Sequence, residues 1–224
     1  MSFSACMAQV YFFSLAAAGD IFVLTSMSYD RYVAICKPLQ YSLIISKDVC
    51  SLLALCPWLI SAVNAALNVL VTSLLSFCPA QSVDHFFCEQ RTLYAVTSSD
   101  TTSQNILLVF QDMYVASLPF LLIITSYAFI IFAILNIQSS EGRRKAFSSC
   151  SSHLTTVIIF FGPVLILYTK PESENSKEQD KLLALLYTAV VPMLNPFVYT
   201  LRNKDILKAT TNLARTDIFF VKKK

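Results

Sequence analysis

The stretch Met27-Ser28-Tyr29-Asp30-Arg31-Tyr32-Val33-Ala34-Ile35-Cys36 places an acid and an arginine at the end of a long apolar run. Charged side chains are costly inside a bilayer but are tolerated at its boundary, where they reach water. The carboxylate of Asp30 can also hold the neighbouring Arg31 guanidinium through charge-assisted hydrogen bonds. The stretch therefore predicts the point where a transmembrane helix meets the aqueous phase.

The composition agrees with a membrane protein. The chain has 224 residues, of which 55% are hydrophobic and 14% are charged. A soluble domain carries about 25% charged residues, so this chain is short of solvated surface. The N-terminal apolar stretch has some features of a secretory signal, but residues 1–8 contain no Lys or Arg and the apolar character resumes at Ile21. A membrane-spanning helix is the better interpretation of this segment.

Five apolar stretches are each long enough to supply the roughly 20 residues that cross a bilayer. They lie near 5–29, 50–75, 106–136, 147–168 and 182–201. The predicted fold class is all-α, a polytopic membrane helix bundle that forms a single domain over residues 1–224. Residues 202–224 form a tail, in which Ile206, Leu207, Leu213 and Ile218 stand among basic residues and predict a short helix on the membrane surface.

The basic residues predict the orientation. Three Lys or Arg lie in 30–48, three in 137–146 and seven in 202–224, which is 13 of the 17 in the chain. Because cytoplasmic segments carry the excess of Lys and Arg, these three segments are assigned to the cytoplasm. The N-terminus is then extracellular and the C-terminus cytoplasmic, as in a multi-pass protein of the plasma membrane.

Several segments, in order along the chain, resemble odorant (olfactory) receptors, a family of rhodopsin-like G-protein-coupled receptors. Besides Asp30-Arg31-Tyr32, these are Asp84-His85-Phe86-Phe87-Cys88, Ser126-Tyr127, Lys145-Ala146-Phe147-Ser148-Ser149-Cys150-Ser151-Ser152-His153-Leu154, and Pro192-Met193-Leu194-Asn195-Pro196-Phe197-Val198-Tyr199. The resemblance implies that the five spans correspond to helices 3–7 of a seven-helix receptor, so that the chain is N-terminally truncated. It implies binding of small odorant molecules and activation of a stimulatory heterotrimeric G protein. The alternative is a truncated, non-signalling receptor fragment or pseudogene product that is retained in the endoplasmic reticulum.

The resemblance also assigns the coupling residues. The expected switch comprises Asp30, Arg31, Tyr32, Tyr127, Asn195, Pro196 and Tyr199. Arg31 would be restrained by Asp30 at rest and would meet the G protein in the active state. From the residues alone, an ordinary interfacial ion pair and a plain proline kink remain open.

The ligand pocket is expected among the outer halves of the spans. Its candidate residues are Phe13, Ser14, Ala17, Ala18, Gln111, Asp112, Val115, Phe161, Val164, Tyr168 and Thr188. An apolar lining with a few polar groups suits small volatile ligands, although for each apolar member taken alone helix packing is the favoured interpretation. Phe161 stands where the family has a tyrosine.

Cysteines and acids suggest a disulfide and two weak ion sites. The resemblance pairs Cys6 with Cys88 and leaves Cys36, Cys50, Cys56 and Cys150 reduced. Asp20 is a sodium-site candidate with Asn195, or else a protonated acid within the bundle. His85, Cys88 and Glu89 resemble a copper or zinc site, but Cys88 cannot be both a disulfide and a thiolate ligand. We expect no resident cofactor beyond a possible sodium ion.

Other function classes fit less well. His153 lies near Ser151 and Ser152 without an ordered acid partner, and no phosphate-binding glycine pattern occurs, so neither an enzyme nor a nucleic-acid partner is expected. A channel that uses Asp20 and Asp112 is a third hypothesis. It is disfavoured because the two acids lie in different predicted spans.

Overall fold

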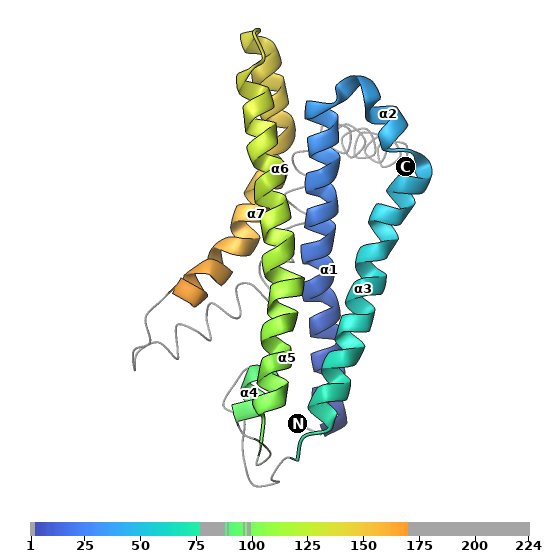
Figure 1. Ribbon diagram of the computed structural model, residues 1–224, viewed down its shortest axis with the longest axis vertical. Helices are drawn as coiled ribbons and strands as arrows, with labels where there is room; N and C mark the ends of the chain where they lie inside the picture. Colours follow the sequence, from blue (N-terminus) through green and yellow to red (C-terminus); the bar gives the residue numbers. More distant parts are fainter. Residues whose placement is uncertain (1–2, 77–87, 89, 96, 98–99, 170–224) are drawn as a thin grey trace, which may run out of the picture. The chain divides into compact units, whose positions relative to one another are not determined.

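The computed structural model describes residues 3–76, 88, 90–95, 97 and 100–169. This part of the chain is helical, with no strand (Figure 1). Its elements are α1 (Phe3–Cys36), the 3₁₀ turn η1 (Pro38–Gln40), α2 (Tyr41–Ile44), α3 (Lys47–Ser73), α4 (Gln90–Ala95), α5 (Thr102–Asp112), the π-helical turn η2 (Met113–Ser117), α6 (Leu118–Leu135) and α7 (Ser140–Thr169). The predicted all-α fold class is confirmed.

The chain divides into two compact units, Met1–Ala146 and Phe147–Lys224. In the first unit α1 packs along both α3 and α6, so it is the central helix of that unit (Figure 1). The short helices α4 and α2 lie at opposite ends of α1. In the second unit the described residues belong to α7, which begins before the boundary.

Three helical segments of the described part are long and apolar enough to cross a membrane: Phe3–Cys36, Lys47–Ser73 and Thr102–Leu135. They contain most of the first three predicted spans, and they support a multi-pass membrane protein. The fourth predicted span, 147–168, falls inside α7, and its crossing stays a prediction. The fifth, 182–201, lies outside the described residues, as does the predicted surface helix in the tail.

The helices extend beyond the predicted membrane spans. The first span was expected to end near 29, but α1 continues through the charged pair to Cys36. The links 30–48 and 137–146 are also partly helical, since η1 and α2 occupy the first and α7 begins at Ser140. Hydropathy marks where the lipid ends, whereas the backbone hydrogen bonds of a helix continue beyond that boundary.

Hydroxyl side chains inside the apolar helices bond to the backbone of their own helix. Thr25 donates to the carbonyl of Ile21 (2.9 Å), and Ser61 donates to the carbonyl of Pro57 (2.7 Å). Such bonds satisfy polar groups that lipid cannot solvate. The bond of Ser61 also occupies a carbonyl near the proline within α3.

The third apolar segment contains a local change of helix type. Between α5 and α6 the chain forms the π turn η2, and Pro119 follows at the start of α6. Proline lacks an N–H and its ring crowds the preceding turn, so the wider π turn accommodates it without ending the segment.

A buried cluster forms the core at the N-terminal end of α1. Its members are Cys6, Met7, Val10, Leu75, Cys88, Leu93, Tyr94 and Leu108. Large apolar side chains elsewhere in the first unit are exposed, among them Leu59 (66%), Phe110 (69%) and Phe132 (68%). In a membrane-spanning bundle such side chains face lipid, which solvates them.

Candidate functional site

The acid–arginine pair lies near the C-terminal end of α1. A guanidinium nitrogen of Arg31 lies 3.3 Å from Oδ2 of Asp30, and the side chains are 35% and 24% exposed respectively. The pair is therefore partly screened by solvent, and its attraction is modest. The expected contact between the two side chains is present, and its role as a restraint stays a prediction.

Tyr41, at the start of α2, completes this end of the site. Its hydroxyl donates to Oδ1 of Asp30 at 2.8 Å. The same hydrogen bond is the main cause that raises the pKa of Tyr41 above its usual value, with burial adding to the shift. Asp30 thus has one oxygen for Arg31 and the other for Tyr41, which ties the link after α1 to the charged pair.

The face of α1 toward α6 holds the third member of the motif. The ring of Tyr32 lies 5.9 Å from the ring of Phe129 in α6, and the thiol of Cys36 lies 3.6 Å from the carbonyl oxygen of Phe129. Tyr127, two residues earlier on α6, is buried. The motif therefore contacts two elements: α2 through Asp30 and α6 through Tyr32.

A cavity of about 330 Å³ adjoins the pair. Asp30 and Arg31 line it together with Cys50 and Trp58 of α3. The 3₁₀ turn nearby presents an apolar side chain to solvent, because Leu39 is 99% exposed. One end of the first unit thus holds the Asp30–Arg31 pair, the cavity beside it and the exposed Leu39.

Toward the other end, amide side chains connect three long helices. Asn68 of α3 donates to the hydroxyl of Ser14 in α1 at 3.0 Å. Gln111 of α5 donates to Oδ1 of Asn68 and, at 2.6 Å, to Oδ1 of Asn64. Gln90 of α4 donates weakly to the backbone carbonyl of Asn68 at 3.5 Å. Buried polar networks of this kind fix the positions of helices relative to one another.

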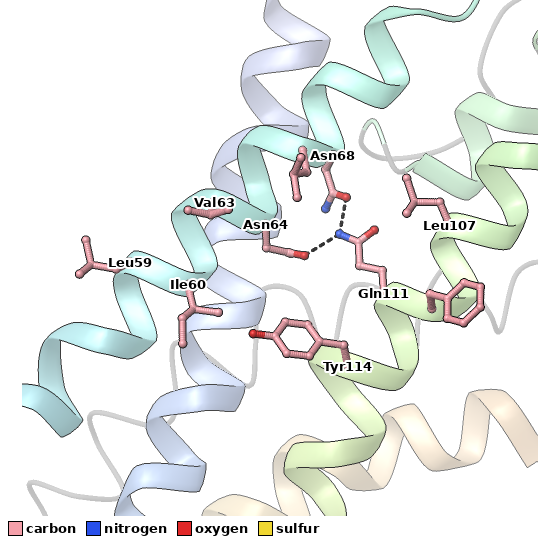
Figure 2. A pocket seen from close by; sticks show the side chains of 10 residues that line it. Leu59, Ile60, Val63, Asn64, Asn68, Leu107, Gln111 and Tyr114 are labelled. Carbon is pink, nitrogen blue, oxygen red and sulfur yellow. Dashed lines mark hydrogen bonds between the residues drawn. The ribbon is translucent and has the colours of Figure 1, made fainter.

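These amides form the polar part of a second cavity, of about 540 Å³, between α3 and α5 (Figure 2). Figure 2 shows Asn64 and Asn68 facing Gln111 across it, with Tyr114 of η2 beside them. The rest of its lining is apolar, with Leu59, Ile60, Val63, Leu67, Leu107 and Phe110.

The structure brings together only part of the predicted ligand pocket. Ser14 and Gln111 both bond to the side chain of Asn68, which therefore links α1 to α5. Phe13, Ala17 and Val115 are half-buried and Ala18 is buried, but none of the four lines the cavity between α3 and α5. The pocket assignment therefore stays a prediction.

The other predicted pocket residues are described in less detail. Phe161 is buried in the second unit, where its ring lies 5.2 Å from that of Phe160. Asp112, Val164 and Tyr168 are placed only as helical positions, the first in α5 and the others in α7. Thr188 lies outside the described residues.

The predicted disulfide is present: Cys6 and Cys88 are bonded, with their Cα atoms 5.5 Å apart. The backbone N–H of Cys88 also donates to the side chain of Gln9 at 3.2 Å, so the segment is held on α1 by two links. Cys36, Cys50, Cys56 and Cys150 are free thiols, as predicted.

The disulfide bears directly on the copper or zinc hypothesis. The sulfur of Cys88 is bonded to Cys6 and is not available as a thiolate ligand. His85 and Glu89 lie outside the described residues. The described residues contain no cluster of three metal-ligating side chains.

The structure describes only some of the residues of the predicted sodium site and switch. Asp20 is half-buried on α1, and its sodium partner Asn195 lies outside the described residues. The same holds for Pro196 and Tyr199 of the switch. The sodium site and the lower part of the switch stay predictions.

The sequence analysis did not identify four residues that contact the predicted site residues: Tyr41, Asn64, Asn68 and Phe129. The two asparagines did carry a signal, because they stand four residues apart in an apolar span, on one face of a helix. Tyr41 and Phe129 carried none, since tyrosine is common at membrane boundaries and phenylalanine is common in spans.

Comparison with known proteins gives a consistent result. Residues 1–216 match the sequence model of a family described as "Olfactory receptor". Olfactory receptor 8D1 of Homo sapiens is 45% identical over 207 residues, which cover 92% of this chain and 67% of that protein. Olfactory receptor 5AR1 of Mus musculus is 44% identical over 213 residues, 95% of this chain and 69% of that protein. Olfactory receptor 13A1 of Homo sapiens is 44% identical over 213 residues and is covered to 65%. The chain spans about two thirds of the length of these relatives.

Proposed function

The chain belongs to the olfactory receptor family, and from that membership we propose that it binds small odorant molecules at its disulfide-bonded end and activates a stimulatory heterotrimeric G protein at the end that holds Asp30 and Arg31. In this function the chain acts as a receptor and has no catalytic role. The relatives it matches are named as receptors, which agrees with this reading.

The arrangement of Asp30 carries the coupling half of the proposal. Its two oxygens are divided between Arg31 at 3.3 Å and Tyr41 at 2.8 Å. Both partners are partly accessible, so a protein that offers acceptor groups to Arg31 can compete with Asp30 for the guanidinium. After separation of the pair, Tyr41 would still be bonded to the other oxygen of Asp30, and α2 would stay tied to α1.

The surface next to the pair suits a protein partner. Leu39 and Leu43 are 99% and 81% exposed in η1 and α2. Neighbouring apolar side chains that are exposed together mark surfaces where a protein or a membrane binds. The G protein would contact Leu39 as it takes Arg31.

The ligand half of the proposal places an odorant against α1. Phe13, Ser14 and Ala17 share one stretch of that helix and are half-buried. Ser14 accepts a hydrogen bond from Asn68, so its hydroxyl is held in place and its own proton can be donated to an odorant oxygen. We propose no bound cofactor for this function other than a sodium ion at Asp20.

The test expresses the 224-residue chain with an N-terminal epitope in cultured cells and measures cAMP during exposure to an odorant panel. We expect a response to at least one odorant, and we expect Arg31→Ala to abolish it while surface labelling stays equal. Lys47→Ala is the matched control, because it removes an exposed basic residue at the start of α3 that has no bond to Asp30.

Two results would contradict the proposal. A chain that reaches the surface but never raises cAMP would lack the coupling function. A chain that stays in the endoplasmic reticulum, without surface label, would favour the alternative of a non-signalling fragment.

A further inference from the structure

The cavity between α3 and α5 shares Gln111 with the predicted odorant pocket but includes none of the pocket residues on α1. Its lining comes from α3, α5 and η2, and no residue of α1 contributes to it. Its volume of about 540 Å³ falls within the range of roughly 300–1,000 Å³ that is common for small-molecule sites. It therefore has the size of a ligand site in its own right.

The walls of this cavity are turned to the outside of the first unit. Leu59, Val63 and Phe110 are 66%, 62% and 69% exposed. These side chains belong to helical segments that are long and apolar enough to span a membrane. A molecule in the cavity would therefore be reached from the lipid rather than from water.

The amides inside the cavity are not all satisfied. Both protons of the Gln111 amide are used, one toward Asn64 and one toward Asn68. Asn68 uses one of its two amide protons toward Ser14, and the second has no partner among the described residues. Among the described residues, the amide nitrogen of Asn64 and the carbonyl oxygen of Gln111 have no hydrogen-bond partner. An unpaired donor and an unpaired acceptor thus line the same lipid-facing cavity, where each lacks the hydrogen bond that water would supply.

A hydroxyl group matches this pair of atoms. Its oxygen accepts from Asn64 and its proton is donated to Gln111, so that one small group satisfies both. An ether or ketone only accepts, an ammonium only donates, and a carboxylate only accepts and would also bring an uncompensated charge into lipid. The apolar side chains around the amides then enclose a hydrocarbon tail.

We propose that the cavity between α3 and α5 is a second ligand site, which takes a neutral amphiphile with one hydroxyl group and an aliphatic tail from the bilayer. The site goes beyond the proposed function, since its occupancy requires neither an odorant response nor a G protein. Asn68 bonds both to Gln111 in this site and to Ser14 on the proposed odorant face, so the site adjoins that pocket.

The test uses the full chain in phosphatidylcholine vesicles and a dodecanol derivative with a photoreactive diazirine in its tail. After irradiation, peptides of α3 and α5 are analysed by mass spectrometry. We expect labels on the segments 59–68 and 107–114, reduced at least five-fold by excess dodecanol but not by dodecyl methyl ether, which cannot donate a hydrogen bond.

Substitutions then test the two amides. Gln111→Leu and, separately, Asn64→Leu should each lower the labelling at least five-fold, whereas Asn105→Leu should leave it unchanged. Asn105 is an exposed amide on the same helix as Gln111 and does not line the cavity. Far-ultraviolet circular dichroism checks that each variant keeps its helical content.

Three outcomes would overturn the proposal. If the ether reduced labelling as much as dodecanol does, the probe would be entering the cavity by partition alone, without recognition of its hydroxyl group. Unchanged labelling in both folded amide variants would mean that the amides do not hold it. Absence of label on both segments, together with a dimeric mass of the purified chain, would mean that a second copy of the chain occupies the groove.

Discussion

Asp30 is the residue on which the proposed switch depends, because its carboxylate has two partners and only two oxygens. Arg31 is adjacent in the chain, and Tyr41 is eleven residues away on another element. A hydroxyl bond to a charged oxygen fixes the orientation of the carboxylate, and so it also determines how the second oxygen faces the guanidinium. Loss of the Tyr41 hydroxyl would thus change how the Asp30 carboxylate faces the guanidinium of Arg31.

Tyr41→Phe should raise basal cAMP production. The substitution removes the bond to Asp30 and keeps the ring, so the restraint on Arg31 weakens by about 1 kcal/mol, which is below the roughly 1.5–3 kcal/mol of bonds to charged groups because this site is partly exposed. About a five-fold larger fraction of receptors with Arg31 released is expected, and cAMP without odorant measures it. Tyr29→Phe is the matched control, since Tyr29 contacts Tyr32 through its ring, in a tilted arrangement with the centroids 6.5 Å apart. A basal level equal to that of the unmodified chain would show that the bond restrains nothing.

The raised pKa of Tyr41 sets the pH range of that bond. Because the hydrogen bond to Asp30 favours the protonated phenol, it is fully present below the usual tyrosine pKa near 10 and is lost only as pH rises through the higher folded value. Near neutral pH the bond is therefore constant. Any pH dependence of basal activity near neutrality must come from another group.

At the scale of helices, Gly19 determines how closely α1 and α3 approach. A β carbon at Gly19 would lie 3.2 Å from Cζ3 of Trp58 in α3. Small residues allow such close packing between membrane helices, which have little other drive to associate. Trp58 is 49% exposed, so its ring has some room to move.

Gly19→Leu should destabilise the first unit, whereas Gly19→Ala should be close to neutral. Alanine requires only a small shift of the Trp58 ring, but leucine forces the helices apart at a cost of about 1–3 kcal/mol. The thermal unfolding midpoint of purified receptor in detergent measures the difference. Gly162→Leu serves as the control, because a β carbon there meets none of the described atoms within 4 Å. Equal midpoints for Gly19→Leu and the unmodified chain would contradict this account of the contact.

The disulfide is the second contact between elements that can be tested. It joins α1 to a segment 82 residues away and lies within the buried cluster of Met7, Val10 and Tyr94. The double substitution of Cys6 and Cys88 by serine should lower surface display several-fold, since loss of a native disulfide typically costs about 2–5 kcal/mol. Cys56→Ser, which removes a free thiol, is the control. Full surface display of the double variant would show that the buried cluster keeps the receptor folded without the disulfide.

The sequence predicted these helices more reliably than the contacts between them. Long apolar runs identified α1, α3 and the α5–α6 segment, because exclusion from water acts on every residue of a span. The π turn before Pro119 and the helical link at Pro38–Ile44 were missed, because both depend on local backbone geometry. Ser14 and Gln111 were both singled out, but their link through Asn68 was not, since it requires knowledge of which helix faces meet.

At the scale of the whole molecule, the two ends of the first unit differ in chemistry. One end carries a disulfide, which forms in an oxidising compartment. The other carries Arg31, Lys37 and Lys47, which favour the cytoplasmic side. Two independent physical arguments, redox state and charge, thus assign the same orientation to α1.

That orientation predicts which thiols are accessible from each side. Cys50 is an exposed free thiol near the start of α3, at the end of the first unit that holds Asp30. A membrane-impermeant maleimide should therefore label Cys50 only after the plasma membrane is permeabilised, while an antibody to an N-terminal epitope should bind intact cells. Cys50→Ser identifies the labelled site, because the signal that appears on permeabilisation should fall when that thiol alone is removed. If the maleimide labelled Cys50 on intact cells, Arg31 would face the extracellular medium. No cytoplasmic G protein could then reach it, and both the orientation and the proposed coupling would be wrong.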